Sequence, residues 1–152
     1  MGEAKQKRDA QRAAEIDELL KIAVEAKLEG LDFISSFSYE QLSDGYNGIG
    51  PSFLPAAVRA KLTRHLAIFA PAAFIHDMRT AASDGSRYGF DFANLEFLEN
   101  CLKLADYHYA WWSWKRYRAR AVAHLLYDCV RGEGGYLAWQ QAIDNEERRK
   151  IQ

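Results

Sequence analysis

A histidine and an aspartate stand next to each other at His76 and Asp77, inside a segment whose composition predicts a helix over residues 71–82. Neighbouring residues on a helix diverge by about 100°, so the two side chains face different partners. His76 shares its helical face with small residues, which leaves room around the imidazole. A histidine in such a place suits general acid–base chemistry, and the adjacent carboxylate suits a hard cation.

An asparagine in the following helical segment is the predicted partner of this histidine. Asn94 lies at helical spacing with a row of residues that favour burial, namely Leu98, Cys101 and Ala105. It therefore points inward, and a buried amide requires a hydrogen-bond partner. Pairing with His76 across two antiparallel helices would satisfy both groups. Asp77 would then face the glycine-rich loop around 48–50, where backbone carbonyls and a carboxylate together suit Ca²⁺.

Three motifs, in this order along the chain, resemble those of the phospholipase A2 superfamily. Residues 46–50, Tyr-Asn-Gly-Ile-Gly, resemble its calcium loop. Residues 72–77, Ala-Ala-Phe-Ile-His-Asp, resemble its catalytic helix, with alanines where the secreted enzymes have cysteines. Residues 93–97, Ala-Asn-Leu-Glu-Phe, resemble the antiparallel partner helix. The resemblance covers roughly residues 44–105 and is similar to bacterial and phage-encoded relatives that lack the disulfides.

The resemblance implies a mechanism as well as a fold. It implies a Ca²⁺ site formed by three backbone carbonyls and one carboxylate, those of Tyr46, Gly48, Gly50 and Asp77. His76 would act as the general base that activates water for attack on an ester carbonyl, and Asn94 would orient the imidazole. The implied function is calcium-dependent hydrolysis of lipid acyl esters at a phospholipid or membrane surface, in a phage- or toxin-associated protein.

The chain departs from the family pattern at two positions, which keeps a second hypothesis open. Asn94 stands where the family has an aspartate, and it cannot supply the negative charge that stabilises an imidazolium. Thr80 stands where the family has a tyrosine. The second hypothesis is a non-catalytic interaction or structural protein that keeps the helical core. Its N-terminal helix would then dock on a protein partner or pair with a second copy to form a homo-oligomer.

Hydrophobic periodicity predicts an all-α fold, with antiparallel helices around the phospholipase A2-like core and a long N-terminal helix. Apolar residues recur at three- and four-residue spacing within residues 3–29, and Gly30 is the expected C-cap. The predicted organisation is an N-terminal helix at 1–30, polar enough at its start to protrude, and a helical domain at 31–152. Within that domain, residues 31–34 have the composition of a brief strand or a turn.

Aromatic and basic residues alternate in the helical segment that follows Asp91. This segment continues without proline to about residue 131, which is too long for one straight helix in a domain of this size, so a break is expected near 106–109. One helical stripe collects Tyr107, Trp111, Trp114 and Arg118. Large aromatic residues at this spacing are typical of a core. The alternative is an exposed patch that binds a lipid interface or a partner.

Composition restricts the other function classes. The chain has 152 residues and a formal net charge of −1, so no overall field attracts nucleic acid, and nucleic-acid binding is not expected. Its two cysteines, Cys101 and Cys129, lie in helical apolar patterns and are expected to be free core thiols. The polar N-terminus lacks the apolar region of a secretory signal, and no apolar run is long enough to span a bilayer. A cytoplasmic protein without signal peptide is therefore predicted, with delivery outside the cell by a phage or contact-dependent system as the reservation.

Overall fold

The computed structural model describes residues 2–46, 57 and 66–151, and every regular element in these ranges is a helix. The elements are α1 (Gly2–Glu25), α2 (Leu31–Ser35), α3 (Tyr39–Gly45), the 3₁₀ helix η1 (Ala67–Phe69), α5 (Ala70–Ala81), α6 (Arg87–His108), α7 (Trp114–Val130) and α8 (Glu133–Ile151). The described residues contain no strand, so the predicted all-α class is confirmed. The alternative of a strand or turn at residues 31–34 is wrong, because these residues form α2.

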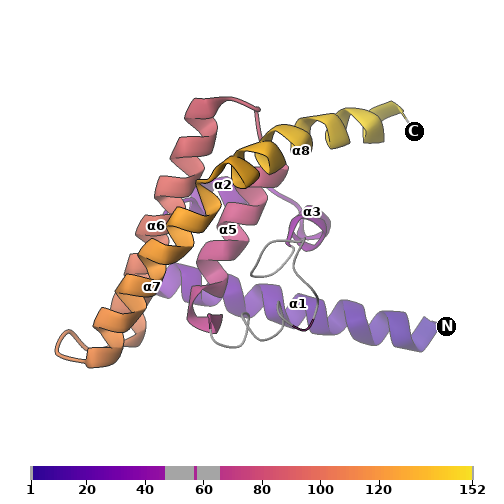
Figure 1. Ribbon diagram of the computed structural model, residues 1–152. Coiled ribbons are helices and arrows are strands. Elements are labelled where there is room, and N and C mark those ends of the chain that lie inside the picture. The colour runs from indigo at the N-terminus through magenta and orange to yellow at the C-terminus, as the bar shows by residue number, and fades with distance from the viewer. Residues whose placement is uncertain (1, 47–56, 58–65, 152) are drawn as a thin grey trace.

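The antiparallel pair α5–α6 lies at the centre of the molecule (Figure 1). Pro71 stands in the first turn of α5, where the missing N–H leaves no helical hydrogen bond unmade. The side chain of Ser86 caps α6 by accepting a hydrogen bond from the N–H of Gly89 at 2.9 Å. α6 thus begins before Asp91. The two helices contribute apolar side chains to the main core, among them Phe74, Met78, Phe97 and Leu104.

Helix α7 returns along α6 after a turn at residues 109–113, so the break predicted near 106–109 occurs slightly later in the chain. This interruption ends the stripe on which the aromatic residues were expected to be core. Trp111 and Trp114 are instead exposed, and so is Tyr107 near the end of α6, so the core interpretation is wrong for all three aromatic residues. Cys101 is buried on α6 as expected, whereas Cys129 is exposed on α7.

Helix α8 crosses the end of the α5–α6 pair that carries the connection between them (Figure 1). Trp139 on α8 packs against Phe90 and Ala93 of α6, in a second apolar cluster separate from the main core. The hydroxyl of Ser83, in the α5–α6 connection, donates a hydrogen bond to the backbone carbonyl of Trp139 at 2.9 Å. This contact ties α8 to the start of α6.

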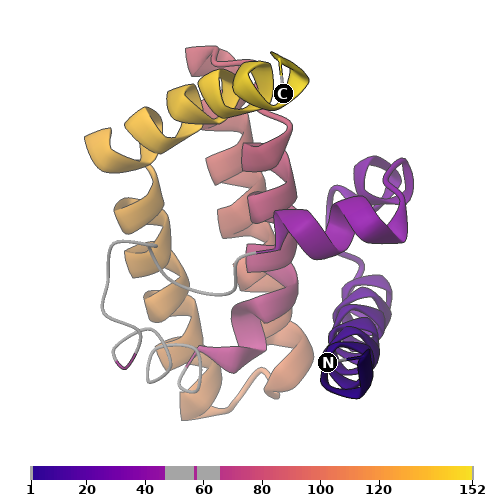
Figure 2. The same ribbon diagram turned by 90° about the vertical axis from the view of Figure 1, so that its right-hand side faces the viewer.

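Figure 2 shows α1, α2 and α3 on one side of the α5–α6 pair, with α7 on the opposite side. The C-terminal half of α1 and the residues after it contribute Ile16, Leu19, Ala23 and Leu28 to the core. Asn100, fully buried on α6, anchors the connection to α2. Its Oδ1 accepts from the N–H of Glu29 at 2.7 Å and its Nδ2 donates to the carbonyl of Glu29 at 3.1 Å. Residues 5–11 of α1, by contrast, are exposed.

Gly30 has a different role from the predicted one. α1 ends at Glu25, and Gly30 directly precedes α2 with a φ of 86°, in the left-handed region that favours glycine. A Cβ at this position would lie 2.9 Å from Cγ2 of Ile75 on α5. Gly30 therefore allows the chain to turn close against α5, and it caps no part of α1.

Candidate functional site

Three elements carry the predicted site residues that the structure describes. His76 and Asp77 lie on α5, Asn94 lies on α6, and Tyr46 directly follows the last residue of α3 as its C-cap. Outside the described residues lie two predicted calcium ligands, Gly48 and Gly50. Of the predicted site, the structure therefore describes the histidine, the amide, the carboxylate and one of the three residues whose carbonyls would bind Ca²⁺.

His76 and Asn94 contact each other across the α5–α6 interface, as predicted. The Nε2 of His76 lies 2.9 Å from the Oδ1 of Asn94. Because an amide oxygen can only accept, Nε2 carries the proton, and Nδ1 is left with a lone pair. The ring of Phe97 packs on the imidazole at a centroid distance of 5.0 Å. The imidazole therefore has one tautomer and one orientation.

The surroundings of His76 favour its neutral form. Burial lowers the pKa of His76 below its ordinary value, while the hydrogen bond with Asn94 and the negative charge of Glu96 act in the opposite direction and are smaller. The imidazole is therefore neutral near pH 7, which is the form that can accept a proton. Part of the surface of His76 remains exposed to solvent, so this residue is not sealed within the core.

The side-chain amide of Asn94 is buried although only one of its two polar atoms has a hydrogen-bond partner among the described residues. The residue is 1% exposed, and its Nδ2 has no hydrogen-bond partner within the described part of the chain. A buried donor left unsatisfied costs about 1–3 kcal/mol. An apolar residue of similar size would avoid that cost but would lose the bond to His76. The position thus favours orientation of the imidazole over stability.

A cavity of about 500 Å³ reaches Asn94 from the side of α7. Its wall is formed by the start of α6 and the end of α7, and the lining residues are Arg87, Asp91, Asn94, Leu95, Tyr127, Asp128, Arg131 and Gly132. The charged groups in it are paired, with Arg87 3.3 Å from Asp91 and Arg131 3.1 Å from Asp128. Asn94 is the residue that this cavity shares with the histidine pair.

Tyr46 and Asp77 lie close enough for their charges to interact. The ring of Tyr46 is 5% exposed and packs edge-to-face on Phe74 at 5.4 Å. Burial raises the pKa of Tyr46 to about 12, with smaller contributions in the same direction from the negative charges of Glu15 and Asp77. The negative charge of Asp77 therefore acts on the residue that follows α3, where the predicted calcium loop begins.

Arg12 on α1 occupies the same region, and the sequence analysis did not include it. Its guanidinium donates hydrogen bonds to the carbonyl of Ser43, at 3.2 Å, and to the carbonyl of Tyr46. It also lies 5.0 Å from the centre of the Tyr46 ring. A predicted calcium ligand is thus hydrogen-bonded to a cationic side chain. The available signal was the spacing of Arg12 four residues before Ile16, which places both on the packed face of α1.

Two further interactions support α5 next to the histidine. The hydroxyl of Thr80 donates to the carbonyl of His76 at 3.0 Å, so this side chain is used within its own helix. Arg79 donates two hydrogen bonds, at 3.0 and 2.8 Å, to the buried carboxylate of Glu96 on α6. The guanidinium also lies 3.9 Å above the ring of Phe33. Sequence carries little signal for this ion pair, because charged residues on helices are usually solvent-exposed.

Neither the described residues nor the comparisons with known proteins assign a function to this chain. Nowhere in the described ranges do three His, Cys, Asp or Glu side chains come together as metal ligands. No helix in the described ranges has both the length and the apolar character needed to cross a bilayer. Comparison of the chain with protein-family models, curated proteins and solved structures found no match. The resemblance to phospholipase A2 therefore depends on the three motifs at residues 46–50, 72–77 and 93–97.

Proposed function

We propose that this protein hydrolyses acyl esters of phospholipids with the help of Ca²⁺, and that His76 is the general base. The hydrogen bond between Nε2 of His76 and Oδ1 of Asn94 carries the proposal. This bond fixes the tautomer in which Nδ1 has the lone pair, and burial keeps the ring neutral. A neutral, oriented imidazole is what proton abstraction from water requires.

In the proposed reaction Nδ1 of His76 takes a proton from the attacking water and later returns it to the leaving alcohol. Asn94 holds the ring through a neutral oxygen, so it stabilises the transient imidazolium less than a carboxylate would. The charge of Glu96 supplies part of that stabilisation, since it raises the pKa of His76. The expected outcome is a slow hydrolase whose rate is limited by the basicity of this imidazole.

The described oxygen donors suit Ca²⁺ in their chemistry, because hard cations prefer carboxylate and carbonyl oxygens. Asp77 and the carbonyl of Tyr46 would hold it, with Gly48 and Gly50 as the two ligands proposed from the sequence. When bound, Ca²⁺ would supply positive charge for the oxygen of the ester carbonyl. Arg12 would have to release the carbonyl of Tyr46, to which it is hydrogen-bonded.

The bond from Arg12 also favours a second candidate function, that of a non-catalytic interaction protein. In that interpretation the guanidinium is the permanent partner of the Tyr46 carbonyl, and no metal binds there. The exposed residues 5–11 of α1 would then dock on a protein partner or on a second copy. The two candidates differ in whether Ca²⁺ binds and whether ester bonds are broken.

The test is release of fatty acid from mixed phospholipid vesicles, in Ca²⁺ and in chelator, by wild type and by His76→Ala. His124→Ala is the matched control, because His124 is exposed on α7. The proposal expects Ca²⁺-dependent release by wild type and by the control, and none by His76→Ala. Release that persists in His76→Ala, or no release by any variant, would move the conclusion to the interaction protein.

A further inference from the structure

Three of the four tryptophans in the chain are exposed in the turn between α6 and α7 and at the first residue of α7. Trp111, Trp112 and Trp114 are 72%, 70% and 76% exposed. In Figure 1 this turn lies at one extremity of the molecule, far from α8 and from both ends of the chain. Tyr117, one turn further along α7, is 56% exposed. Large aromatic side chains gathered on a projecting turn are unusual for a surface that faces only water.

The backbone of this turn is held by hydrogen bonds, so the tryptophans are presented from a defined support. The N–H of Ser113 donates to the carbonyl of Ala110 at 2.9 Å, and the hydroxyl of Ser113 accepts from the N–H of Lys115 at 3.2 Å. The rings of Trp111 and Trp112 contact each other edge-to-face at 5.6 Å. Trp111 and Trp112 therefore form a pair of exposed rings, and the exposed Trp114 follows two residues later.

The cations at the start of α7 divide into a paired and an unpaired set. Arg116 and Arg120 both bind the carboxylate of Asp106, at 2.7 and 2.9 Å. Within the described residues, Lys115 and Arg118 form no ion pair. Lys115 follows the exposed Trp114 directly, and Arg118 lies one helical turn after it on the same face. Two cations that have no ion-pair partner among the described residues therefore stand next to the exposed tryptophans in the chain.

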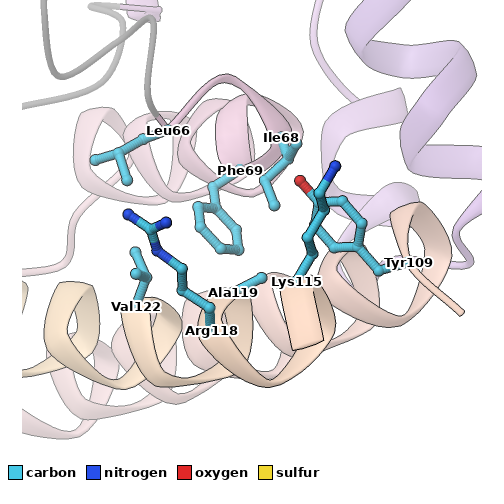
Figure 3. A pocket seen from close by; sticks show the side chains of 8 residues that line it. All are labelled: Leu66, Ile68, Phe69, Tyr109, Lys115, Arg118, Ala119 and Val122. Carbon is cyan, nitrogen blue, oxygen red and sulfur yellow. The ribbon is translucent and has the colours of Figure 1, made fainter. Parts of the chain in front are cut away.

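The same two cations border a cavity of about 390 Å³ between η1 and α7 (Figure 3). In Figure 3 the ring of Phe69 lies between the Arg118 and Lys115 side chains, with Ala119 and Val122 on the α7 side. The cavity combines an apolar floor with a cationic rim. A group that carries a negative charge next to apolar carbon would match both parts.

We propose that the α6–α7 end, defined by Trp111, Trp112, Trp114, Lys115 and Arg118, is a docking surface for an anionic phospholipid bilayer. Tryptophan concentrates at the boundary between head groups and acyl chains, where its apolar ring and its N–H are both accommodated. Lysine and arginine beside such rings attract phosphate and carboxylate head groups. Lys115 and Arg118 have no ion-pair partner among the described residues, and their positive charge beside a projecting aromatic turn favours an anionic lipid surface as the partner.

The docking surface is separate from the histidine site. Asn94 and His108 are 14 positions apart on α6, which corresponds to about 21 Å along the helix axis. A role for this surface in bringing the enzyme to its substrate depends on the proposed function. Binding itself requires neither His76 nor Ca²⁺, so the two proposals can fail independently.

The experiment measures binding of the full chain to vesicles in chelator, with lipids whose ester bonds are replaced by ethers so that no turnover occurs. Vesicles of phosphatidylcholine alone are compared with vesicles that also contain phosphatidylserine. Wild type is expected to co-sediment with the anionic vesicles, more strongly at low salt. Its fluorescence is expected to shift to shorter wavelengths, since three tryptophans become buried while Trp139 is buried already.

Two variants and two matched controls make the test specific. K115A/R118A is expected to bind the anionic vesicles about 25-fold more weakly, since each cation near an anionic surface contributes about fivefold. Replacement of the three exposed tryptophans by serine is expected to abolish both the binding and the fluorescence shift. R8A/K21A removes two exposed cations of α1, and Tyr88→Ser removes an exposed aromatic of α6, and both should bind as wild type does. Thermal unfolding followed by circular dichroism checks that each variant is folded.

Three results would overturn the proposal. The first is that wild type stays in solution when mixed with anionic vesicles at low salt. The second is that the control variants lose as much binding as K115A/R118A and the tryptophan variant. A dimer that depends on the three tryptophans, without vesicle binding, would assign the surface to a second copy of the chain. Lipid binding by an inactive protein would remove the proposed hydrolase alone. If the protein hydrolyses a dispersed monomeric ester but does not bind vesicles, the docking surface is ruled out and the proposed hydrolase is not.

Discussion

The partly buried imidazole of His76 predicts a pH-dependent loss of stability that a glutamine in its place should remove. Burial lowers the pKa of His76 in the folded protein, whereas the unfolded chain keeps an ordinary value near 6.5. Below about pH 6.5 the unfolded state therefore binds a proton that the folded state does not. The free energy of unfolding then falls as the pH falls, and the contribution of His76 is fully regained above that pH.

The size of the effect follows from this difference in proton binding. Protonation of a histidine with the ordinary pKa stabilises the unfolded chain by about 1.4 kcal/mol between pH 7.5 and pH 5.5, so His76 can lower the free energy of unfolding by no more than this amount. This is an upper value, because the bond with Asn94 and the charge of Glu96 both oppose the lowering of the pKa. His76→Gln has no titrating group, and its amide can still donate to Asn94. Between these two pH values the variant should lose up to about 1.4 kcal/mol less than wild type.

The assay is urea unfolding at pH 7.5 and pH 5.5, followed by circular dichroism, for wild type, His76→Gln and the exposed control His124→Gln. Every titratable group other than His76 is common to wild type and His76→Gln, so the difference between these two proteins isolates the imidazole. Parallel pH dependence in these two proteins would mean that His76 is not held neutral. A variant that loses more stability than wild type at pH 5.5 would mean that the folded pKa is raised. Either result would refute the argument for a neutral base.

Three further substitutions test the site and its support. Asn94→Asp should raise the pKa of His76, measured by NMR titration, because a carboxylate would then face Nε2; an unchanged titration would mean that the observed contact does not form in solution. Arg12→Met should tighten Ca²⁺ binding, measured calorimetrically, because it frees the carbonyl at the end of α3; equal or weaker binding would indicate that no metal competes with the guanidinium. Gly30→Ala should lower the free energy of unfolding by about 2 kcal/mol, since it places a Cβ at a φ of 86° and against α5. Gly134→Ala, where a Cβ meets nothing within 4 Å, is its control, and equal effects of the two substitutions would contradict the role given to the turn.

Local signals were enough to predict the helix that carries the histidine. Pro71 suits a helix start, and the residues after it favour helix, so α5 was expected within one residue of its observed bounds. The inward row on which Asn94 lies predicted its pairing with His76, since buried amides require partners and the two helices are joined by a short connection. Both inferences depend on spacing within a helix, which is a local property.

Signals that depend on where a helix stops were less reliable. The stripe of Tyr107, Trp111, Trp114 and Arg118 runs across the region where a break was itself expected, and α6 ends within it at His108. The turn that follows points the tryptophan rings away from the core, so residues that have the composition of a core are exposed. Gly30 shows the same limit. The helix predicted to run to residue 29 ends at Glu25, four residues earlier, and the glycine allows a close approach to another helix.

The sequence by itself determined the helical class, the helix around His76 and the pairing of that residue with Asn94, because helical periodicity and the need to satisfy buried polar groups act over a few residues. Only the tertiary structure decided that Arg12 binds the carbonyl of Tyr46 and that Arg79 pairs with Glu96, because these contacts join segments far apart in the chain. It also decided which aromatic residues face the solvent. Burial is a property of the packed molecule, and a turn of a few residues was enough to reverse it.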